Sequence, residues 1–390
     1  MADRSETVSE TRLCWVASAV EVPDELWQTA FGPPVEGRWW YRALERAGVD
    51  DQFRFAYGVV ERGGHPIGIV PTFLMDVPID LVAPPLVAKV LRAGGRVMPR
   101  LRYQRTLFVG SPCSDEGTVG LVAGESLGCL AEVVQDALEQ RALVAGASMI
   151  VWKDFPEEND EALEALSAAR GLFRSVGFPG TRVRLPGSSF DDYLMALKAP
   201  KRHRLRRSLR RGHEACPLET TVARNLSRAE IAEMFDLFWQ TYEHGKTKFE
   251  RLTREFFAAI AAEPQAHFVL MRSRKTGCLA AFMLHFLSGR RAINKFIGLD
   301  YGLGRQAKLY FQLWEQAVRF AYSAGAEEIQ SGQTGYPVKL DIGHELVPLT
   351  NWCKHRNPLI HRVFAAVSSR ITWAALDPDL EEAQSSRATD

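Results

Sequence analysis

The feature that most constrains the fold is a repeated order of predicted elements: a β-hairpin, a long helix and a short buried strand occur twice. In the first copy these elements are strands at 53–60 and 67–75, a helix at 126–145 and a strand at 148–152. In the second copy they are strands at 267–271 and 279–287, a helix at 306–324 and a strand at 328–331. Gly146 and Gly325 end the two helices at equivalent places, inside Ala-Gly-Ala. The repeat predicts a tandem duplication of one α/β unit.

The 390 residues are enough for two domains. We expect an α/β (α+β) protein with two subdomains, at 12–185 and 186–376, each a mixed sheet flanked by helices. The polar ends, 1–11 and 377–390, are predicted to be disordered. Ser227 and Glu230 form a capping box that predicts a helix between the two copies. A second helix is expected at about 252–262 and a closing helix at 358–376.

Charge and composition exclude several classes of protein. A formal net charge of +1 gives no overall attraction to nucleic acid or membranes. No apolar run reaches the roughly 18 residues of a membrane span, and the N-terminus lacks a signal peptide, so we expect a cytoplasmic protein without integral membrane association. The six cysteines form no C-x-x-C pair and are expected to be reduced and mostly buried. No histidine spacing indicates a metal site.

Two short motifs are better explained by local structure than by catalysis. Residues 124–128 match the G-x-S-x-G pattern of a nucleophile elbow, but the preceding hairpin is antiparallel, so Ser126 is interpreted as a helix N-cap. Gly245-Lys246-Thr247 resembles the end of a P-loop, but it lacks the earlier glycine and follows a helix rather than a strand.

A basic run at 201–211 is the strongest local signal, because it holds seven Lys and Arg residues and no acid. On a helix Arg202, Arg206 and Arg210 form one stripe, and Arg204, Arg207 and Arg211 form another. Guanidinium groups so arranged can bind phosphates. We expect an anionic partner, either a phosphorylated donor, a sugar nucleotide or RNA; a solvated helix surface is the alternative.

A glycine-containing segment at 298–308 connects a predicted strand to a helix. Backbone N–H groups at such a junction can bind phosphate, and Arg305 and Lys308 add positive charge beside Gly302 and Gly304. A simple tight turn is the alternative.

Several stretches together resemble the GNAT-type N-acyltransferase superfamily, in particular its double-GNAT branch of FemAB-like proteins and the related BioF2-like acetyltransferase domain. They are Gln330 to Tyr336 with Lys339 and Gly343, Tyr310 to Ala317, and Phe190 to Leu194 before the basic run. The resemblance implies two GNAT-like subdomains and transfer of an activated acyl or aminoacyl group to an amine.

The resemblance also implies substrates and site residues. The expected donor substrate is acyl-CoA, such as acetyl-CoA, with no bound cofactor, and the expected acceptor is a small or cell-envelope-related amine. The alternatives are an aminoacyl-tRNA donor held by the arginine run and a non-catalytic ligand-binding protein. Candidate catalytic residues are Glu315, Asp300 and Tyr336, and Gly302, Gly304, Arg305 and Lys308 are candidates for the donor site. Acceptor or anion binding is assigned to Arg202, Arg206, Arg207, Arg210, Gln330, Gln333 and Lys339. The oligomeric state stays open.

Overall fold

The computed structural model describes residues 10–32, 36–78, 103–245 and 251–381. The chain divides into two compact units. Unit 1 comprises Met1–Arg42, Asp50–Phe178 and Pro348–Leu376, and unit 2 comprises Ala43–Val49, Pro179–Val347 and Asp377–Asp390. The units differ from two consecutive halves, because 348–376 returns to unit 1 and the strand at 180–184 belongs to unit 2.

Unit 1 is built on a mixed sheet. The strands in spatial order are β1 (Thr11–Val16), β2 (Arg54–Arg62), β3 (His65–Pro78), β4 (Tyr103–Val109), β6 (Met149–Pro156), β15 (Leu349–His355) and β7 (Phe173–Val176), with β5 (Gly120–Leu121) beside β3. The pair β4–β6 is parallel and the other pairs are antiparallel.

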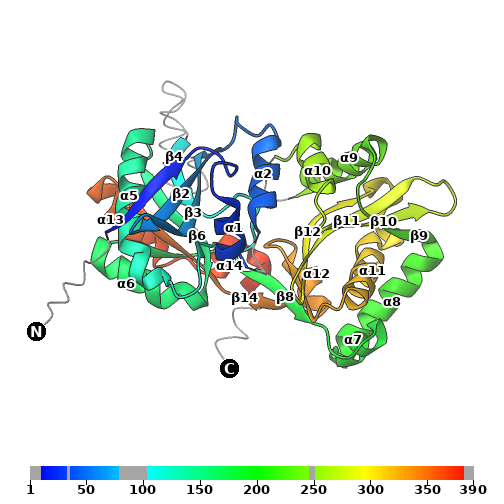
Figure 1. The fold of residues 1–390 in the computed structure, drawn as a ribbon. Helices are drawn as coiled ribbons and strands as arrows, with labels where there is room; N and C mark the ends of the chain where they lie inside the picture. The colour runs from blue at the N-terminus through cyan, green and yellow to red at the C-terminus, as the bar shows by residue number, and fades with distance from the viewer. Residues whose placement is uncertain (1–9, 33–35, 79–102, 246–250, 382–390) are drawn as a thin grey trace, which may run out of the picture. The chain divides into compact units, whose positions relative to one another are not determined.

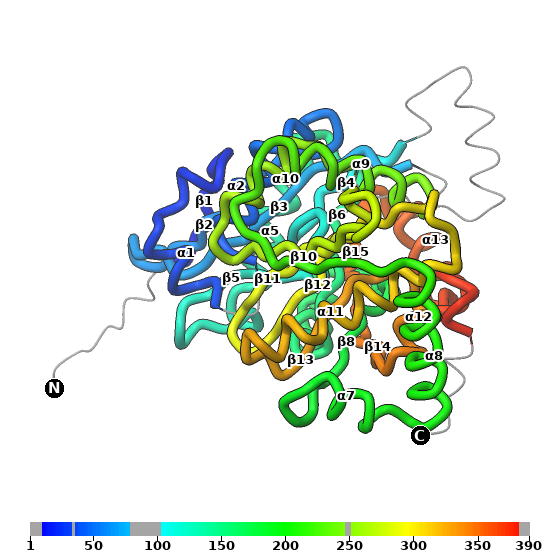
Figure 2. The backbone as a smooth tube through the Cα atoms, turned by 90° about the vertical axis from the view of Figure 1, so that its right-hand side faces the viewer, coloured from blue at the N-terminus to red at the C-terminus, as the bar shows by residue number. Residues whose placement is uncertain are grey.

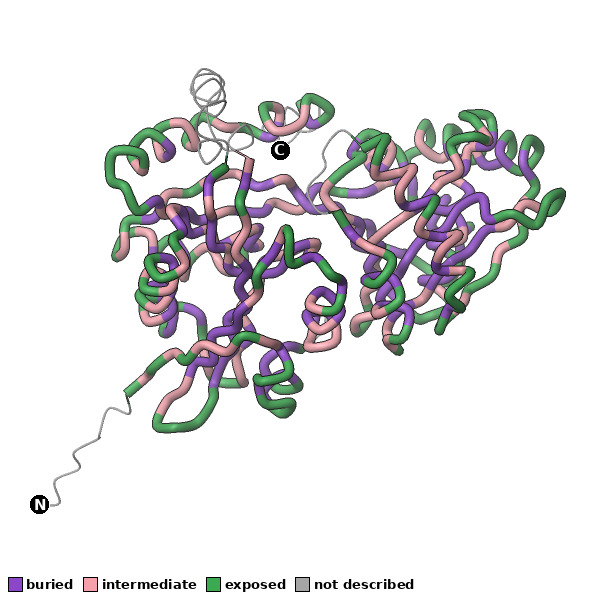
Figure 3. The backbone as a smooth tube through the Cα atoms, turned by 90° about the horizontal axis from the view of Figure 1, so that it is seen from above, coloured by how far each residue is buried: buried purple, intermediate pink, exposed green. Residues whose placement is uncertain are grey.

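Helices cover both faces of this sheet. Ile150 and Trp152 of β6 lie in one core with α5 (Leu127–Ala145) and α6 (Asp160–Arg170). Met149, the neighbour of Ile150, packs on the other face against Phe364 of α13 (Pro358–Ser368). The helices α1 (Asp24–Ala30) and α2 (Arg38–Arg46) bring Trp27 and Tyr41 against Tyr57 of β2. Buried residues follow the strands and exposed residues follow the outer sides of the helices (Figure 3).

Unit 2 has the same plan. Its strands in spatial order are β14 (Glu345–Val347), β8 (Gly180–Arg184), β13 (Glu328–Ser331), β12 (Arg291–Leu299), β11 (Leu279–Ser288), β10 (Ala266–Ser273) and β9 (Leu218–Ala223). Only β12 and β13 form a parallel pair among these strands.

The two faces of the second sheet carry different helices (Figure 1). Phe282 of β11 packs against Phe257 of α10 (Arg254–Ala261), and the neighbouring helix α9 (Arg228–His244) brings Phe238 against Phe296 of β12. Met283 points to the opposite face, where it shares a core with α11 (Leu309–Ser323), α8 (Ala199–Ala215) and α7 (Phe190–Ala196).

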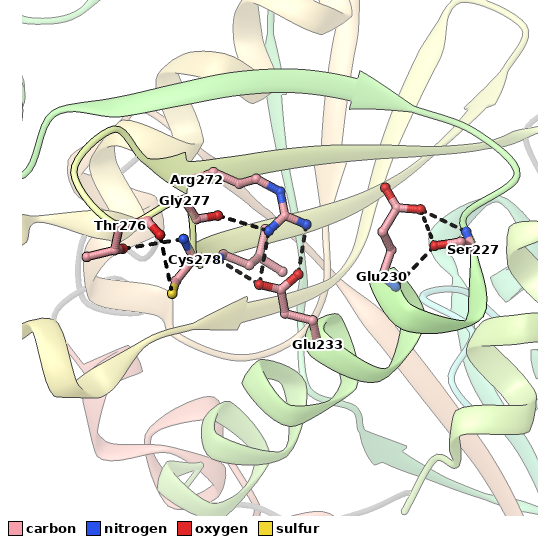
Figure 4. A network of polar contacts seen from close by, with 8 residues as sticks. Ser227, Glu230, Glu233, Arg272, Thr276, Gly277 and Cys278 are labelled. Carbon is pink, nitrogen blue, oxygen red and sulfur yellow. Dashed lines mark hydrogen bonds and ion pairs between the residues drawn. The ribbon is translucent and has the colours of Figure 1, made fainter.

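Side-chain contacts fix the start of α9 on the β10–β11 hairpin (Figure 4). The predicted capping box is present, since Ser227 Oγ accepts from the Glu230 N–H and the Glu230 carboxylate accepts from the Ser227 N–H. One turn later Glu233 forms a bidentate ion pair with Arg272, at 2.8 and 3.0 Å, and accepts from the Leu279 N–H. This pairing lowers the pKa of Glu233.

The structure confirms both predicted hairpins, the duplicated helix and strand order and the mixed-sheet class. Three details were wrong. The helix expected from 306 begins at Leu309, and the helix expected over 358–376 breaks into α13 and α14 (Trp373–Leu376). The end predicted to be disordered contains a 3₁₀ turn at Pro378–Leu380, with Leu380 fully buried, and Thr11 already lies in β1. Residues 1–9 and 382–390 lie outside the described residues.

The expectation for the thiols was also wrong in part. All six cysteines lie in the described residues and are free, but only Cys216 and Cys353 are buried. Burial raises the pKa of Cys353 to about 12, so this thiol stays protonated at neutral pH.

Candidate functional site

The parallel strands of unit 2 separate halfway along β12. Arg291 to Asn294 pair with Glu328 to Ser331, where β13 ends. The pairing of β12 with β11 skips Lys295, a bulge that bends the strand. Beyond the bulge β12 continues to Leu299, paired with β11 alone. The point where two parallel strands part, close to the carboxyl ends of both, is a common place for a ligand site.

A buried chain of hydrogen bonds lies at this point. The amide nitrogen of Asn294 donates to Ser331 Oγ at 3.1 Å, and Ser331 Oγ lies 3.1 Å from His344 Nε2. His344 Nδ1 lies 3.2 Å from the Lys339 carbonyl oxygen, so Nδ1 carries the proton and Nε2 accepts from the serine. No local sequence pattern predicts this chain, because its members are separated by 37 and 13 positions.

The electrostatics of the chain exclude His344 as a base at neutral pH. Burial and the nearby Lys339 ammonium lower the pKa of His344 to about 3, so the imidazole is neutral. Lys339 is itself buried and donates to the carbonyl oxygens of Ser331 and Gly332. The Lys339 ammonium thus lies against the carbonyl groups at the end of β13.

The segment 300–308 folds into two 3₁₀ turns, at Tyr301–Leu303 and Arg305–Ala307. The Gly302 N–H donates to the Asp300 carboxylate at 2.8 Å. The N–H groups of the following turn positions donate to carbonyl oxygens within the segment; these are Leu303, Gly304, Ala307 and Lys308. Lys308, with φ of 48°, then starts α11. Most backbone donors of the segment are therefore already used, which leaves few for a phosphate group.

The positive charges of this segment remain available. Arg305 is exposed and Lys308 half-buried, and neither side chain has a hydrogen bond or ion pair within the described residues. Gly212 of α8 packs directly on the segment. A Cβ at Gly212 would lie 2.9 Å from the Ala307 carbonyl oxygen and 3.1 Å from Lys308 Cβ. The absence of a side chain at Gly212 thus allows α8 to lie against the residues that lead into α11.

Helix α8 turns its arginines to solvent. Leu205, Leu209 and Gly212 form its buried side, and α8 runs beside α11, joined to it by His213 Nε2 and Glu315 Oε2 at 2.9 Å (Figure 2). The opposite side carries four exposed arginines that have no ion pair or hydrogen bond with any described residue. We call them the arginine face: Arg206, Arg207, Arg210 and Arg211.

Other cations of the basic run have structural partners. Arg202 donates to the Met195 and Leu197 carbonyl oxygens at the end of α7, and Arg204 pairs with Asp341 at 2.7 Å. Lys201 donates to the Leu340 carbonyl oxygen. Of the six arginines in the two stripes predicted from the sequence, four thus form the arginine face, and Arg202 and Arg204 bind other parts of unit 2.

The remaining predicted residues lie on separate elements of unit 2. Glu315 accepts from Arg319 at 2.8 Å as well as facing His213, and the Tyr336 hydroxyl donates to the Pro179 carbonyl oxygen at 3.0 Å. Gln330 accepts from Arg291 at 2.8 Å. Gln333 is half-buried in the turn after β13.

Within the described residues, no cluster of three His, Cys, Asp or Glu side chains could hold a metal ion.

Unit 1 has a counterpart of the segment 300–308 in residues 110–126, between β4 and α5. Here the loop packs into the sheet: the Gly117 N–H donates to the Asp154 carbonyl oxygen, and a Cβ at Gly117 would lie 2.0 Å from the Lys153 carbonyl oxygen. Ser126 precedes α5 as predicted, but its side chain accepts no capping hydrogen bond and instead contacts Cys129 Sγ at 3.3 Å.

Comparison with solved structures defines the class. The chain is similar to FemX, with a TM-score of 0.58 at 12% identity, covering 91% of this chain and 99% of that one. It is similar to L-PGS from Bacillus licheniformis, with a TM-score of 0.54 at 11% identity and coverages of 89% and 96%. A tandem GNAT protein from the clavulanic acid biosynthesis pathway gives 0.51 at 15% identity, with coverages of 90% and 99%. The fold is that of a tandem GNAT protein, in agreement with the predicted class.

The family follows from the sequence model of the FemAB-like proteins, described as peptidoglycan biosynthesis/recognition, which matches residues 158–371. This match spans more than half of the chain, and the protein belongs to the FemAB-like family. No curated protein matches the sequence. No helix within the described residues is long and apolar enough to cross a membrane.

Proposed function

We propose that this protein is an aminoacyltransferase that moves an aminoacyl group from aminoacyl-tRNA to an amine of a cell-envelope precursor. The observation that carries the proposal is the junction of α8 with the segment 300–308 at Gly212. It holds the helix that carries the arginine face against the segment that carries Arg305 and Lys308, and these six cations have no protein partners in the described residues.

Such a surface fits a polyanion better than a small phosphorylated donor. RNA presents a phosphate at every nucleotide, and arginine binds phosphate through two parallel hydrogen bonds. The description of the FemAB-like family supports an acceptor from peptidoglycan biosynthesis.

In this reaction the lone pair of the acceptor amine attacks the ester carbonyl carbon of the donor. A C–N bond forms, the bond to the ribose oxygen of the tRNA breaks, and the amine proton ends on the released ribose hydroxyl. Binding both reactants in one orientation supplies much of the rate in such transfers. His344 does not serve as the base, because its pKa is about 3. Its neutral ring instead holds Ser331 and the end of β13 in place.

Acyl-CoA is the second candidate donor, and Arg305 and Lys308 at the start of α11 are the residues that favour it. Its pyrophosphate would need free backbone N–H groups at this helix start. Five N–H groups of the segment 300–308 donate within the segment, so the structure favours RNA over CoA.

The test measures binding of aminoacyl-tRNA over a series of salt concentrations, with a double variant, Arg206→Gln with Arg210→Gln. The control variant, Arg228→Gln with Lys275→Gln, removes equal charge from exposed positions elsewhere in unit 2. We expect the arginine variant to bind about 10- to 100-fold more weakly, and its log–log salt slope to fall by about 1.4 if each arginine neutralises one phosphate of single-stranded RNA.

The control variant should keep wild-type affinity and salt slope. Equal losses in both variants would indicate nonspecific attraction and would contradict the proposed site. A rise of the thermal midpoint with acetyl-CoA that Arg305→Ala abolishes would instead support the acyl-CoA donor.

A further inference from the structure

The helix α13 of unit 1 presents an apolar face to solvent. Leu359, Ile360 and Val363 are 68%, 42% and 51% exposed. Val363 follows Leu359 by four positions and Ile360 by three, so the three side chains share one side of the helix, and Ala366 continues that side by one further turn. We call these four residues the α13 face.

Other residues of α13 hold this helix on the sheet of unit 1. Phe364, which borders this face, is buried against Met149 and Cys353, and the His361 ring contacts Phe173. Asn357 caps the helix by accepting from the N–H groups of Leu359 and Ile360 at 2.9 and 3.2 Å. The helix is thus fixed by these contacts and its cap. Exposing three large apolar side chains together is unfavourable in water and is typical of an interaction surface.

The charged side chains of α13 and of the residues immediately beside it in the sequence are of one sign. Residues 356–376 contain Arg356, Arg362 and Arg370 and no Asp or Glu. Arg356 and Arg362 are exposed, and their side chains have no hydrogen bond or ion pair within the described residues. A two-fold contact between copies through this face would bring arginines of one copy towards arginines of the other. An anionic lipid surface offers phosphates to the arginines and an apolar layer to the leucine, isoleucine and valine.

We propose that the α13 face docks unit 1 on the surface of a membrane that contains anionic lipids. The helix has 11 residues, far short of a membrane span, and lies in the interface with its apolar side towards the acyl chains. Docking is peripheral and reversible, because only a few side chains enter the lipid. The surface belongs to unit 1 and its binding does not require the transfer reaction.

The experiment is co-sedimentation of the full chain with vesicles of phosphatidylcholine, with and without phosphatidylglycerol. The test variant is Leu359→Ser with Val363→Ser. The matched control is Met195→Ser with Val222→Ser, which changes two unit 2 residues that are 61% and 51% exposed. Because all four side chains are exposed, both variants should keep the wild-type thermal midpoint.

We expect the wild type to sediment with the phosphatidylglycerol vesicles and to bind pure phosphatidylcholine less. The test variant should partition about tenfold or more weakly, and the control should match the wild type. A second variant, Arg356→Gln with Arg362→Gln, should lose the preference for phosphatidylglycerol.

Three results would overturn the proposal: no sedimentation of the wild type, equal sedimentation of the test variant, or loss of self-association instead of vesicle binding in that variant. The vesicles contain no tRNA, so failure of the proposed transfer reaction would leave this result unchanged.

Discussion

The two units share one plan but differ where the strand of the parallel pair runs into its helix. In unit 1 the connection, residues 110–126, is long, and its Ser111, Ser114 and Asp115 are buried. Gly117 lies on the backbone of β6 beyond the last residue pair of β4 with β6. In unit 2 the connection, residues 300–308, is short and mostly exposed, and within the described residues none of its N–H groups donates to β13 or to 332–335.

The two copies thus have the same fold but differ in structure at this connection. The chain's own loop fills the end of the parallel pair in unit 1, so little room for a donor remains there. In unit 2 no N–H group of the connection donates to β13 within the described residues, and unit 2 carries Arg305, Lys308 and the arginine face. We therefore propose that the donor binds to unit 2 alone.

The largest difference between the units is expected in how their stability depends on acidic pH. Burial lowers the pKa of His285 and of His344 in unit 2 to about 3, against 6.5 for a free histidine. Between pH 6.5 and 3 the unfolded chain therefore binds protons at these two histidines that the folded unit does not bind. The free energy of unfolding is at its full value above pH 6.5 and falls as the pH is lowered towards 3. At pH 5 we expect a loss of about 2 kcal/mol for each histidine.

Urea unfolding at several pH values, followed by hydrogen exchange in each unit, measures this loss. His285→Leu should remove about half of the acid sensitivity of unit 2, because His285 and His344 have equally lowered pKa values. His65→Gln, at an exposed position of unit 1, should leave the pH dependence unchanged. An acid sensitivity that His285→Leu does not reduce would contradict the assignment.

The next largest effect concerns the filled loop of unit 1. Gly117→Ala would place a Cβ 2.0 Å from the Lys153 carbonyl oxygen and 2.7 Å from the Phe155 ring. We expect the free energy of unfolding to fall by about 3 kcal/mol in urea titrations. Gly128→Ala, whose Cβ would have only one neighbour at 3.9 Å, should be neutral or slightly stabilising. Equal stability of both variants would show that the loop does not pack as described.

A smaller change tests the contact between α8 and the donor segment. Gly212→Ala should cost about 1–2 kcal/mol of stability, because its Cβ would meet the Ala307 carbonyl oxygen. The shift of α8 away from Arg305 and Lys308 should also weaken tRNA binding several-fold, as fluorescence anisotropy would show. Ser208→Ala on the same helix serves as the control. Unchanged tRNA affinity in Gly212→Ala would separate the arginine face from the donor segment.

The smallest effect is expected at Ser126, because its side chain makes no capping hydrogen bond. Ser126→Ala should change stability by less than about 0.5 kcal/mol and leave transferase activity unchanged. Loss of activity in this variant would revive the hydrolase interpretation of the G-x-S-x-G pattern.

Local patterns were enough to predict most elements of the fold. The hairpins, the capping box at Ser227 and the left-handed glycine that ends α5 depend on neighbouring residues, and all three are present. The place of β15 was not predictable in this way. Its pairing of Leu349 with Pro156 joins residues almost two hundred positions apart, and no short sequence pattern carries that information.

The site was predictable only in part. The basic run indicated a surface for an anionic partner, but tertiary contacts decided which cations stayed free, since Arg202 and Arg204 bind other parts of unit 2. The glycines at 302 and 304 suggested free N–H groups, yet the 3₁₀ turns use them. The chain from Asn294 to His344 combines residues from two strands and a turn, and only the folded sheet brings them together.

Hydrogen–deuterium exchange of the protein with and without aminoacyl-tRNA tests the assignment of the donor to unit 2 most directly. The account predicts slower exchange at residues 199–215 and 300–308, with residues 110–126 unchanged. Protection confined to 110–126, or equal protection of both connections, would contradict it.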